Sequence, residues 1–459
     1  MIHGERVQVL NDADTVRGRY VLYWMQQSQR ATCNHALQYA VRRADELGLP
    51  VVVGFGITQR YPEANERHYA FMLEGLRETE KALAERGIQL VVRKQPPVDA
   101  ALELADDAAE VTADRGYLRF QKAWRRRGAE RARCRLVQVE SDVVVPVETT
   151  SGKEEYAART IRPRIHEQLD KFLVPLEETN PARDSLDMEF GGQDLADIRS
   201  VLDELRLNRD AAPVPHFRGG TAEAERLLAE FINSKLERYA DGRNEPAADC
   251  VSHMSPYLHF GQISPLRVAL AVDEARDRGA DNVEAYLEEL IVRRELSMNY
   301  CHYCADYGSL DGLPGWAQET LADHADDRRK HTYTMDELER GKTHDPWWNA
   351  AQREMVLRGK MHNYMRMYWG KKILEWVPDP REAFRVALTL NNRYELDGRD
   401  GNSFTGVAWC FGKHDRAWAE RPVFGKVRYM SAAGLERKFD MEAYVRRVEE
   451  LEDGEGEST

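Results

Sequence analysis

The chain is poor in cysteine, contains no long apolar run and has no excess of basic residues. Six cysteines among 459 residues are too few for a disulfide framework, so we expect reduced thiols. The longest nearly apolar run, 48–57, is far shorter than the ~20 residues that cross a bilayer, and the first residues lack a signal-peptide core. We therefore expect a cytoplasmic protein with no membrane partner.

The charge balance excludes a protein that binds nucleic acid through bulk positive charge. Lys and Arg total 65 against 78 Asp and Glu, which gives a net charge of -13. A nucleic-acid surface therefore has to be local. Between 353 and 438 the balance reverses, with 17 basic and 10 acidic residues, so any such surface is expected in the C-terminal part of the chain.

Several motifs with a known chemistry are also missing. Neither GxGxxG nor GxxxxGK(S/T) occurs, so the sequence supports neither a dinucleotide fingerprint nor a phosphate loop. Cys301 and Cys304 have CxxC spacing, but the second such pair that would indicate a metal cluster is absent. We expect packed thiols and no metal site.

The composition, with 42% apolar and 9% aromatic residues, is that of a folded protein. The length is sufficient for two domains, each with its own hydrophobic core. Residues 1–150 alternate between strand-like and helix-like periodicity, which is typical of a parallel sheet covered on both faces. Strands are expected at 19–25, 51–53, 88–93 and 136–147, and helices at 31–47, 66–86 and 124–135. We predict an α/β domain at 1–150 with a doubly wound, Rossmann-like parallel sheet.

Prolines, charges and a glycine pair interrupt the periodicity at 151–208, which we interpret as an interdomain linker. From 209 to 459 we predict an all-helical domain, which holds most of the tryptophans. Helices are expected at 221–239, 264–278, 281–304, 346–358, 360–377, 380–389 and 436–452.

One expected helix, 281–304, carries polar residues where a core is expected. Glu295 and Asn299 continue the row of Ile291 at i, i+4 spacing. A buried carboxyl there would hold or share a proton. The simpler interpretation, which one helix alone favours, is that Glu295 pairs with Arg293 or Arg294 on a solvated face.

A second segment, 359–376, combines methionines and aromatics with Arg366. A methionine and aromatic face at helical spacing usually belongs to a core, and a guanidinium within it needs an anionic partner. Asp397 and Asp400, on a glycine-containing turn, are the candidates.

Longer runs of sequence then identify a family. The chain resembles the photolyase/cryptochrome superfamily, most closely the class II cyclobutane pyrimidine dimer photolyases, and the similarity covers nearly the whole chain. The matching runs are YWMQQSQR at 23–30, SPYLHFGQIS at 255–264, LEELIVRRELS at 287–297, 359–376, 391–400 and RPVFGKVRYM at 421–430.

The resemblance implies a U-shaped FAD inside the helical domain, with an ion pair between Arg366 and Asp397 beside its ring. Asn391 resembles the class II asparagine at the flavin's reactive edge, and Asn402 is the alternative. The residues that match FAD contacts are Tyr239, Val251, Ser252, His253, Met254, Ser255, Asn299, Arg366, Asn391, Asp397 and Arg399.

The implied activity is light-driven repair of cyclobutane pyrimidine dimers in UV-damaged DNA, by electron transfer from excited reduced FAD to a flipped-out dimer. Glu295 resembles the acidic residue that hydrogen-bonds the dimer. The residues that match the dimer pocket or the gap in the duplex are Arg243, Asn244, Glu295, Met367, Trp409, Arg416, Trp418 and Arg428.

Tryptophans are the expected route by which oxidised FAD regains electrons. Spacing alone pairs Trp369 with Trp376, because Trp348 would lie roughly 30 Å from Trp369 on one straight helix. A break at Gly359 would fold the two segments together. The resemblance matches Trp369 to the flavin-proximal position and Trp348 to the surface-side position, with Trp376 as a neighbour, and we follow it.

The resemblance also allows an antenna chromophore in the N-terminal domain, an 8-hydroxydeazaflavin or a folate, and suggests a monomer. Three alternatives remain. A cryptochrome-like blue-light receptor would share the fold without repairing DNA. A (6-4) photolyase would need catalytic histidines in the dimer pocket; His253 and His362 could be mistaken for these, but the class II motifs argue against it. A light-independent nucleotide-binding or DNA-binding module would leave the tryptophan-rich half unexplained.

Overall fold

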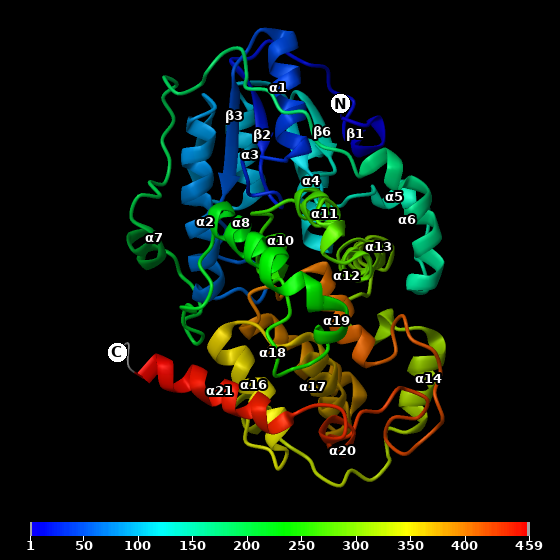
Figure 1. The fold of residues 1–459 in the computed structure, drawn as a ribbon. Coiled ribbons are helices and arrows are strands. Elements are labelled where there is room, and N and C mark those ends of the chain that lie inside the picture. The colour runs from blue at the N-terminus through cyan, green and yellow to red at the C-terminus, as the bar shows by residue number, and fades with distance from the viewer. Residues whose placement is uncertain (1, 457–459) are drawn as a thin grey trace.

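The computed structural model describes residues 2–456, in which a sheet-containing N-terminal part packs against a larger helical part (Figure 1). The sheet has six strands in the order β1-β6-β5-β2-β3-β4. The strands are β1 (Val7–Val9), β2 (Tyr20–Trp24), β3 (Val51–Gly56), β4 (Gln89–Arg93), β5 (Ala108–Asp114) and β6 (Arg135–Val139).

The predicted fold class is confirmed, with one addition. The strands from β2 to β6 are mutually parallel, while β1 pairs antiparallel with β6 at the edge. The order of the parallel strands reverses between β2 and β5, the first and fourth parallel strands in the chain. In doubly wound sheets this switch point is where a crevice opens at the carboxyl ends of the strands.

Alternation along β2 explains why helices cover both faces of the sheet. Val21 and Tyr23 belong to the core shared with α1 (His35–Leu47) and α2 (Glu66–Ala84). Leu22 and Trp24 point to the other face and pack with residues of α3 (Pro97–Ala105) and α4 (Arg119–Arg131). Successive side chains of a strand face opposite sides, so a strand buried on both faces reads as one continuous apolar run.

The segment expected to be a linker contains regular structure. After α5 (Val147–Thr150), it forms α6 (Ala158–Phe172) and the short α7 (Ile198–Glu204). Ile161 and Ile165 of α6 are buried in the core that also holds Leu290 and Ile291. Part of this connection is therefore packed against the helical part of the chain.

Helices form the remainder, as predicted. Those up to residue 303 are α8 (Thr221–Glu230), α9 (Tyr239–Gly242), α10 (Ser255–His259), α11 (Pro265–Asp273), α12 (Ala280–Leu287) and α13 (Arg294–Tyr303). The later ones are α14 (Gly315–Asp323), α15 (Met335–Glu339), α16 (Pro346–Arg358), α17 (Asn363–Trp376), α18 (Pro380–Tyr394), α19 (Gly401–Cys410), α20 (Ala432–Glu436) and α21 (Met441–Gly456).

Two of the expected long helices are interrupted by π-helical segments. One spans Phe231–Lys235, and the other, Glu288–Arg293, connects α12 to α13. A π-helical turn holds one more residue than an α-helical turn, so it changes which side chains share a face. Such turns occur frequently at functional sites.

The predicted break at Gly359 is present. Gly359 ends α16 with φ +70°, a left-handed conformation that glycine adopts without strain. The chain then reverses into α17, so that residues far apart in sequence come together along the two helices.

The N-terminal and helical parts meet at buried charged groups, among them Glu295. Its Oε1 accepts the N–H of Val144 at 2.5 Å and that of Val145 at 3.3 Å. Beside it, Arg294 pairs with Asp142 at 2.9 Å. Glu295 is 2% exposed and burial raises its pKa to about 8. The expectation that Glu295 contacts a substrate is therefore wrong, because its carboxyl is used to join the two parts of the chain.

We predict that Glu295→Ala lowers the free energy of unfolding by about 1–3 kcal/mol, because it leaves buried backbone N–H groups without an acceptor. Glu295→Gln keeps an acceptor oxygen and should lose less. Chemical denaturation of the three proteins measures the difference. An alanine variant as stable as the wild type would show that this carboxyl does not hold the interface.

Candidate functional site

A cavity opens in the helical part between α10, α12 and the loop that follows α18. Hydroxyl groups, apolar side chains and charged groups line it together. The lining residues are Tyr239, Ser252, Met254, Ser255, Leu258, Tyr286, Glu289, Leu290, Arg294, Asp397, Asp400 and Asn402. Four of the residues expected to bind a cofactor, Tyr239, Ser252, Met254 and Ser255, belong to this wall, and so does Asp397.

Arg366 lies behind this wall, between two carboxylates. Its Nη2 is 3.4 Å from Oδ1 of Asp397, the expected partner, and 3.1 Å from Oε2 of Glu395, which the sequence did not single out. Burial opposes the charge on Asp397, but Arg366 and Lys360 lower its pKa below the usual range. Burial raises the pKa of Glu395 to about 8. One ionised carboxylate, Asp397, thus faces the cavity beside a fixed cation.

A second cation reaches the same wall. Lys360 Nζ donates to Ser255 Oγ at 2.8 Å. The hydroxyl of Tyr286 donates to Ser252 Oγ at 3.0 Å. Hydroxyls and an ammonium group at one edge of a cavity are suitable donors for phosphate oxygens.

Two expected cofactor residues lie just outside the lining. His253 has a left-handed backbone, φ 56°, and its Nε2 is 2.7 Å from Asp249 Oδ1. Val251 is partly buried and is absent from the wall. Both residues lie on the loop that carries Ser252 and Met254 into the wall.

Of the two asparagines considered for the reactive edge of a flavin, Asn402 lines the cavity and its Nδ2 donates to Asp400 Oδ2 at 3.0 Å. Asn391 is 1% exposed, and its Nδ2 donates to Ser403 Oγ. Asn391 therefore lies behind the wall, and Asn402 is part of it.

Two other expected cofactor residues serve different parts of the structure. Asn299 accepts the N–H of Glu155 at 2.8 Å and donates to the carbonyl of Lys153 at 2.9 Å, so it holds the start of the connection between the domains. Arg399 lines a different cavity, described below. Neither belongs to the wall around Asp397.

Glu289 lines the cavity together with Asp397 and Asp400. It lies in the π-helical segment, its side chain is 36% exposed, and its Oε1 accepts Arg243 Nη1 at 2.6 Å. Regular helical spacing from Ile291 connects Glu295, not Glu289, to the apolar stripe, so the sequence pattern did not single out Glu289. The adjacent acidic pair at 288–289, ahead of the arginines, was the available signal.

Three of the four tryptophans in α16 and α17 form a contact series, namely Trp348, Trp369 and Trp376. The rings of Trp348 and Trp369 are stacked with centroids 6.3 Å apart, and those of Trp348 and Trp376 are 5.4 Å apart. Trp348 is wholly buried. Its expected surface-side position is therefore wrong, because Trp348 is the middle member and connects the other two.

The other residues expected near DNA are split between buried and exposed positions. The Arg416 and Arg428 guanidiniums lie 4.9 and 5.2 Å from the ring centroid of Trp418, which is 39% exposed. Asn244 is exposed, and the Arg293 guanidinium lies 5.5 Å from the ring centroid of Trp409. Met367 is partly buried, with its Sδ 3.9 Å from Cys410 Sγ.

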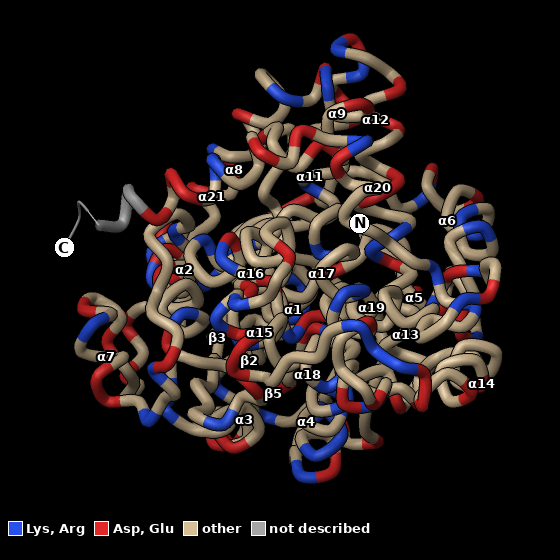
Figure 2. The backbone as a smooth tube through the Cα atoms, turned by 90° about the horizontal axis from the view of Figure 1, so that it is seen from below, with Lys and Arg blue, Asp and Glu red and all other residues tan. Residues whose placement is uncertain are grey.

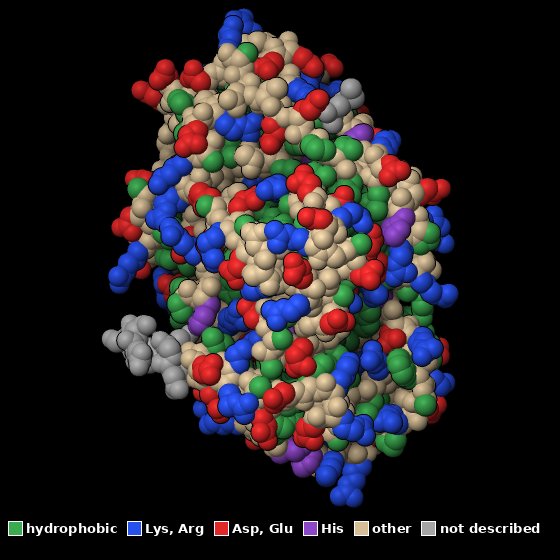
Figure 3. All heavy atoms as spheres, viewed as in Figure 1, with side chains coloured by type: hydrophobic (Ala, Val, Ile, Leu, Met, Phe, Trp, Pro, Cys, Tyr) green, Lys and Arg blue, Asp and Glu red, His purple; other side chains and the backbone are tan. Residues whose placement is uncertain are grey.

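Tyr156 is an exposed tyrosine that contacts the loop carrying Arg416 and Trp418. The Tyr156 hydroxyl donates to the carbonyl of Asp415 at 3.0 Å, and its ring is 45% exposed. Outside the cluster of Arg416, Trp418 and Arg428, acidic and basic residues are mixed along the backbone (Figure 2) and over the face of the molecule shown in Figure 3. The cluster of Arg416, Trp418 and Arg428 is thus a local feature, as the charge balance requires.

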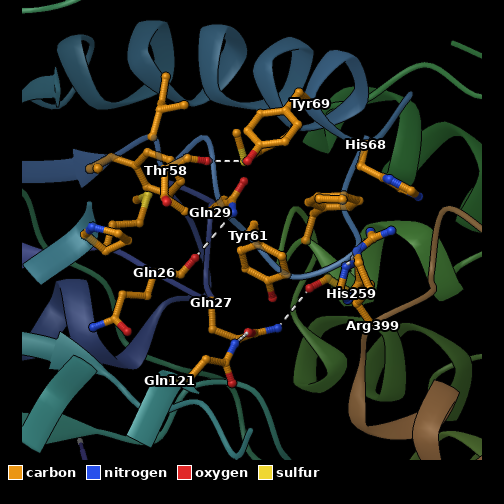
Figure 4. Close-up of a pocket in the computed structure, with 18 of the residues that line it drawn as sticks. Gln26, Gln27, Gln29, Thr58, Tyr61, His68, Tyr69, Gln121, His259 and Arg399 are labelled. Carbon is orange, nitrogen blue, oxygen red and sulfur yellow. Dashed lines mark hydrogen bonds between the residues drawn. The ribbon is translucent and has the colours of Figure 1, made fainter. Parts of the chain in front are cut away.

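A second cavity lies at the carboxyl ends of the parallel strands, at the junction with the helical part (Figure 4). Its polar lining includes four glutamines, and Gln26 has both side-chain polar atoms buried without a protein partner among the described residues. The lining residues are Met25, Gln26, Gln27, Gln29, Phe55, Gly56, Ile57, Thr58, Tyr61, Ala64, His68, Tyr69, Met72, Pro97, Gln121, Trp124, His259, Phe260 and Arg399.

Within residues 2–456, no cluster of histidine, cysteine or acidic side chains could hold a metal ion, and all six cysteines are free thiols. No helix in the described part of the chain is both long and apolar enough to cross a membrane.

Comparison with known proteins agrees with this architecture. A family profile described as DNA photolyase matches residues 21–182. The deoxyribodipyrimidine photo-lyase of Methanothermobacter thermautotrophicus is 53% identical over 99% of this chain and 100% of the relative. The Arabidopsis thaliana protein of the same name is 39% identical over 94% of this chain and 89% of the relative.

Solved structures show the same fold. A class III photolyase from Agrobacterium tumefaciens superposes with a TM-score of 0.74 at 19% identity, covering 95% of this chain and 88% of the other. An archaeal photolyase from Sulfolobus tokodaii, described with two FAD molecules, gives 0.70 at 18% identity, covering 94% and 91%. The chain therefore belongs to the DNA photolyase family, FAD-containing lyases that act on UV-damaged DNA.

Proposed function

We propose that the protein repairs cyclobutane pyrimidine dimers in DNA with light, using FAD bound in the cavity around Asp397. The observation that carries the proposal is the paired Arg366 and Asp397 behind a cavity lined with hydroxyls, in a chain 53% identical to a deoxyribodipyrimidine photo-lyase. When bound, FAD supplies the light-driven one-electron chemistry. The side chains position it, exclude water and bind the lesion.

The cavity wall fits such a cofactor. Ser252, Ser255 and Lys360 would hold the phosphates, because hydroxyl and ammonium donors meet there. Arg366, held at 3.4 Å from Asp397, would place a fixed positive charge near an anionic ring. Asn402 in the wall and Asn391 behind it are the amides available to its reactive edge.

The lesion would be held by Glu289 in place of the expected Glu295. Its carboxyl lies in the cavity wall and is accessible, and Arg243 orients it from one side. A hydrogen bond that the acid form of Glu289 donates to a carbonyl oxygen of the lesion strengthens as negative charge develops on that oxygen, and it would therefore favour ring splitting over simple binding.

The direct test is blue-light repair of an oligonucleotide with one thymine dimer by the purified, reduced protein. We expect restored thymines in light and none in darkness. An FAD spectrum without repair would support the alternative, a cryptochrome-like receptor.

We predict that Glu289→Ala retains FAD but lowers the repair yield per absorbed photon several-fold, because the hydrogen bond to the charged lesion is lost. The matched control is Glu288→Ala, since Glu288 is the preceding residue and pairs with Arg162 outside the cavity. Repair yields at saturating DNA measure the effect. Equal yields for both variants would remove Glu289 from the mechanism.

We further propose that Arg416, Trp418 and Arg428 meet the gap that a flipped-out dimer leaves in the duplex. Guanidinium and indole surfaces stack on unpaired bases, and arginines also bind phosphates. Trp418 is available for this because it is exposed and held between two guanidiniums.

We predict that Trp418→Ala weakens binding to dimer-containing duplex by about tenfold, the equivalent of one stacking contact of about 1–3 kcal/mol, and changes binding to undamaged duplex little. Arg340→Ala, an exposed arginine just after α15, is the control. Titrations with both duplexes at fixed salt supply the comparison. Equal losses on the two duplexes would mean that Trp418 does not recognise the lesion.

We also propose that the second cavity binds a light-harvesting chromophore. Aromatic walls and unpaired amide groups suit a flat ring with hydrogen-bonding edges, and the switch point of a doubly wound sheet is a common ligand site. The Sulfolobus tokodaii photolyase holds two FAD molecules, which implicates a novel light-harvesting cofactor in that protein. The candidates here are a deazaflavin, a folate or a second flavin.

We predict that Gln26→Leu weakens binding of that chromophore by about tenfold, which corresponds to the loss of hydrogen bonds worth about 1.4 kcal/mol. FAD content at the cavity around Asp397 should not change, and Gln168→Leu on α6 is the control. Fluorescence titration with 8-hydroxydeazaflavin, a reduced folate and FAD in turn gives the affinities. If Gln26→Leu binds the chromophore with the same affinity as the wild type, the light-harvesting chromophore binds at a different site.

A further inference from the structure

The glutamine-rich cavity at the carboxyl ends of the strands has a neighbour. A second space of about 540 Å³, here called the outer hollow, lies where β3 and β4 end. Ile57 and Thr58 line both spaces, and Pro96 of the outer hollow directly precedes Pro97 of the cavity. The cavity and the outer hollow therefore meet along one shared edge. The other residues that line the outer hollow are Gln59, Arg60, Lys94, Gln95, Glu204 and Arg206.

Basic side chains dominate the outer hollow. Lys94 Nζ is 2.8 Å from Oε2 of Glu204, which is the one acidic residue among the described residues of the lining. Arg60 and Arg206 are exposed, and neither guanidinium has an ion-pair or hydrogen-bond partner within residues 2–456. Two guanidiniums are therefore available to an anion, each with several N–H donors.

The backbone holds these two arginines at the same turn. The N–H of Arg60 donates to Thr58 Oγ1 at 3.2 Å, and the N–H of Arg206 donates to Gln59 Oε1 at 2.8 Å. Thr58 belongs to the shared edge, and Gln59 follows it in the chain. Residues 146 positions apart in the sequence are thus brought to one side of the cavity entrance.

The shared edge is a close approach of backbone. Gly56 ends β3, and a Cβ atom at this position would lie only 2.7 Å from Pro97 Cα, at the first residue of α3. The start of a helix also carries a partial positive charge, which favours a nearby anion. An anion in the outer hollow would therefore have a defined position relative to a ring in the cavity.

The charge of the cavity itself does not oppose an anionic ligand. Among the described residues no carboxylate lines it, and Arg399 is its one permanently charged side chain (Figure 4). Its amides can bind a ring but supply no counter-charge, since Gln29, which is 6% exposed, has a buried Oε1 without a partner among the described residues. In a chain with a net charge of -13, two adjoining spaces with this excess of cations are exceptional.

We propose that the outer hollow binds the anionic end of the light-harvesting chromophore while the cavity binds its ring. The anion is a phosphate or a chain of carboxylates on the ring's substituent, and Arg60 and Arg206 pair with it. Lys94, positioned by Glu204, supplies the third positive charge. This inference rests on the proposed function, because it requires a chromophore in the glutamine-rich cavity.

The test compares probes that share one ring and differ in the anionic end. The pairs are 8-hydroxydeazaflavin and its ribityl phosphate, riboflavin and FMN, and a reduced folate with one glutamate and with several. Fluorescence titrations use the FAD-loaded full chain, so that the cavity around Asp397 is already filled. At low salt, we expect the more anionic member of at least one pair to bind about tenfold more tightly, and high salt should reduce this preference. The pair that shows the preference distinguishes a phosphate from a carboxylate chain.

The variant that removes both free guanidiniums, Arg60→Gln with Arg206→Gln, should abolish the preference and leave the affinity for the neutral ring unchanged. The matched control is Arg17→Gln with Arg19→Gln. These two exposed arginines precede β2, at the opposite ends of the parallel strands, and their removal changes the net charge by the same amount. An equal loss of preference in the control would mean that the effect comes from net charge, and the inference would be overturned.

Gln26→Leu distinguishes failure of this inference from failure of the proposed chromophore cavity. If no ring binds, or if binding of the ring does not depend on Gln26, the cavity does not hold the chromophore and both proposals are wrong. If the ring binds and depends on Gln26, but both members of every pair bind equally, the cavity proposal stands and the outer hollow is not part of the site. FAD absorbance in each variant verifies that the protein is folded and loaded.

Discussion

The pairing of Arg366 with Glu395 and Asp397 is the constraint around which the helical part of the structure is arranged. A guanidinium removed from water is tolerated only where carboxylates compensate it. That requirement brings α17, which carries Arg366, against the loop that follows α18. The reversal at Gly359 makes this possible, and the same reversal brings Trp348 against Trp369. One buried ion cluster thus positions both the cavity wall and the start of the aromatic series.

A second chain of polar groups lies between the two cavities. Arg399 Nη2, in the wall of the glutamine-rich cavity, is 3.4 Å from His259 Nε2, and His259 Nδ1 is 3.9 Å from Asp400, in the wall of the other. These three side chains connect the two walls.

Sequence patterns predicted the fold where burial and periodicity agree. The apolar strands β2, β3 and β4 were recognisable, whereas β5 was missed because its run AAEVTAD includes polar residues. The two acidic residues have distant partners, since Glu110 pairs with Arg43 and Asp114 accepts the N–H groups of Gln26 and Ser28. Similarly, α6 was hidden within the expected linker. Its core contacts involve residues more than a hundred positions away, which local spacing does not reveal.

The candidate site also shows that local spacing in the sequence does not reveal which residues face a cavity. The family resemblance, and not the α-helical row through 281–304, assigned Glu295 to the lesion. The π-helical segment at Glu288–Arg293 also inserts a residue into that row. The insertion turns Glu289 toward the cavity and leaves Glu295 facing the N-terminal part, where it accepts the N–H of Val144. A π-helical turn costs stability relative to an unbroken helix, so its retention at this point requires compensation. Six positions separate Glu289 from Glu295, so the two carboxylates lie on different faces of the helix, and one helix serves both the cavity and the domain interface.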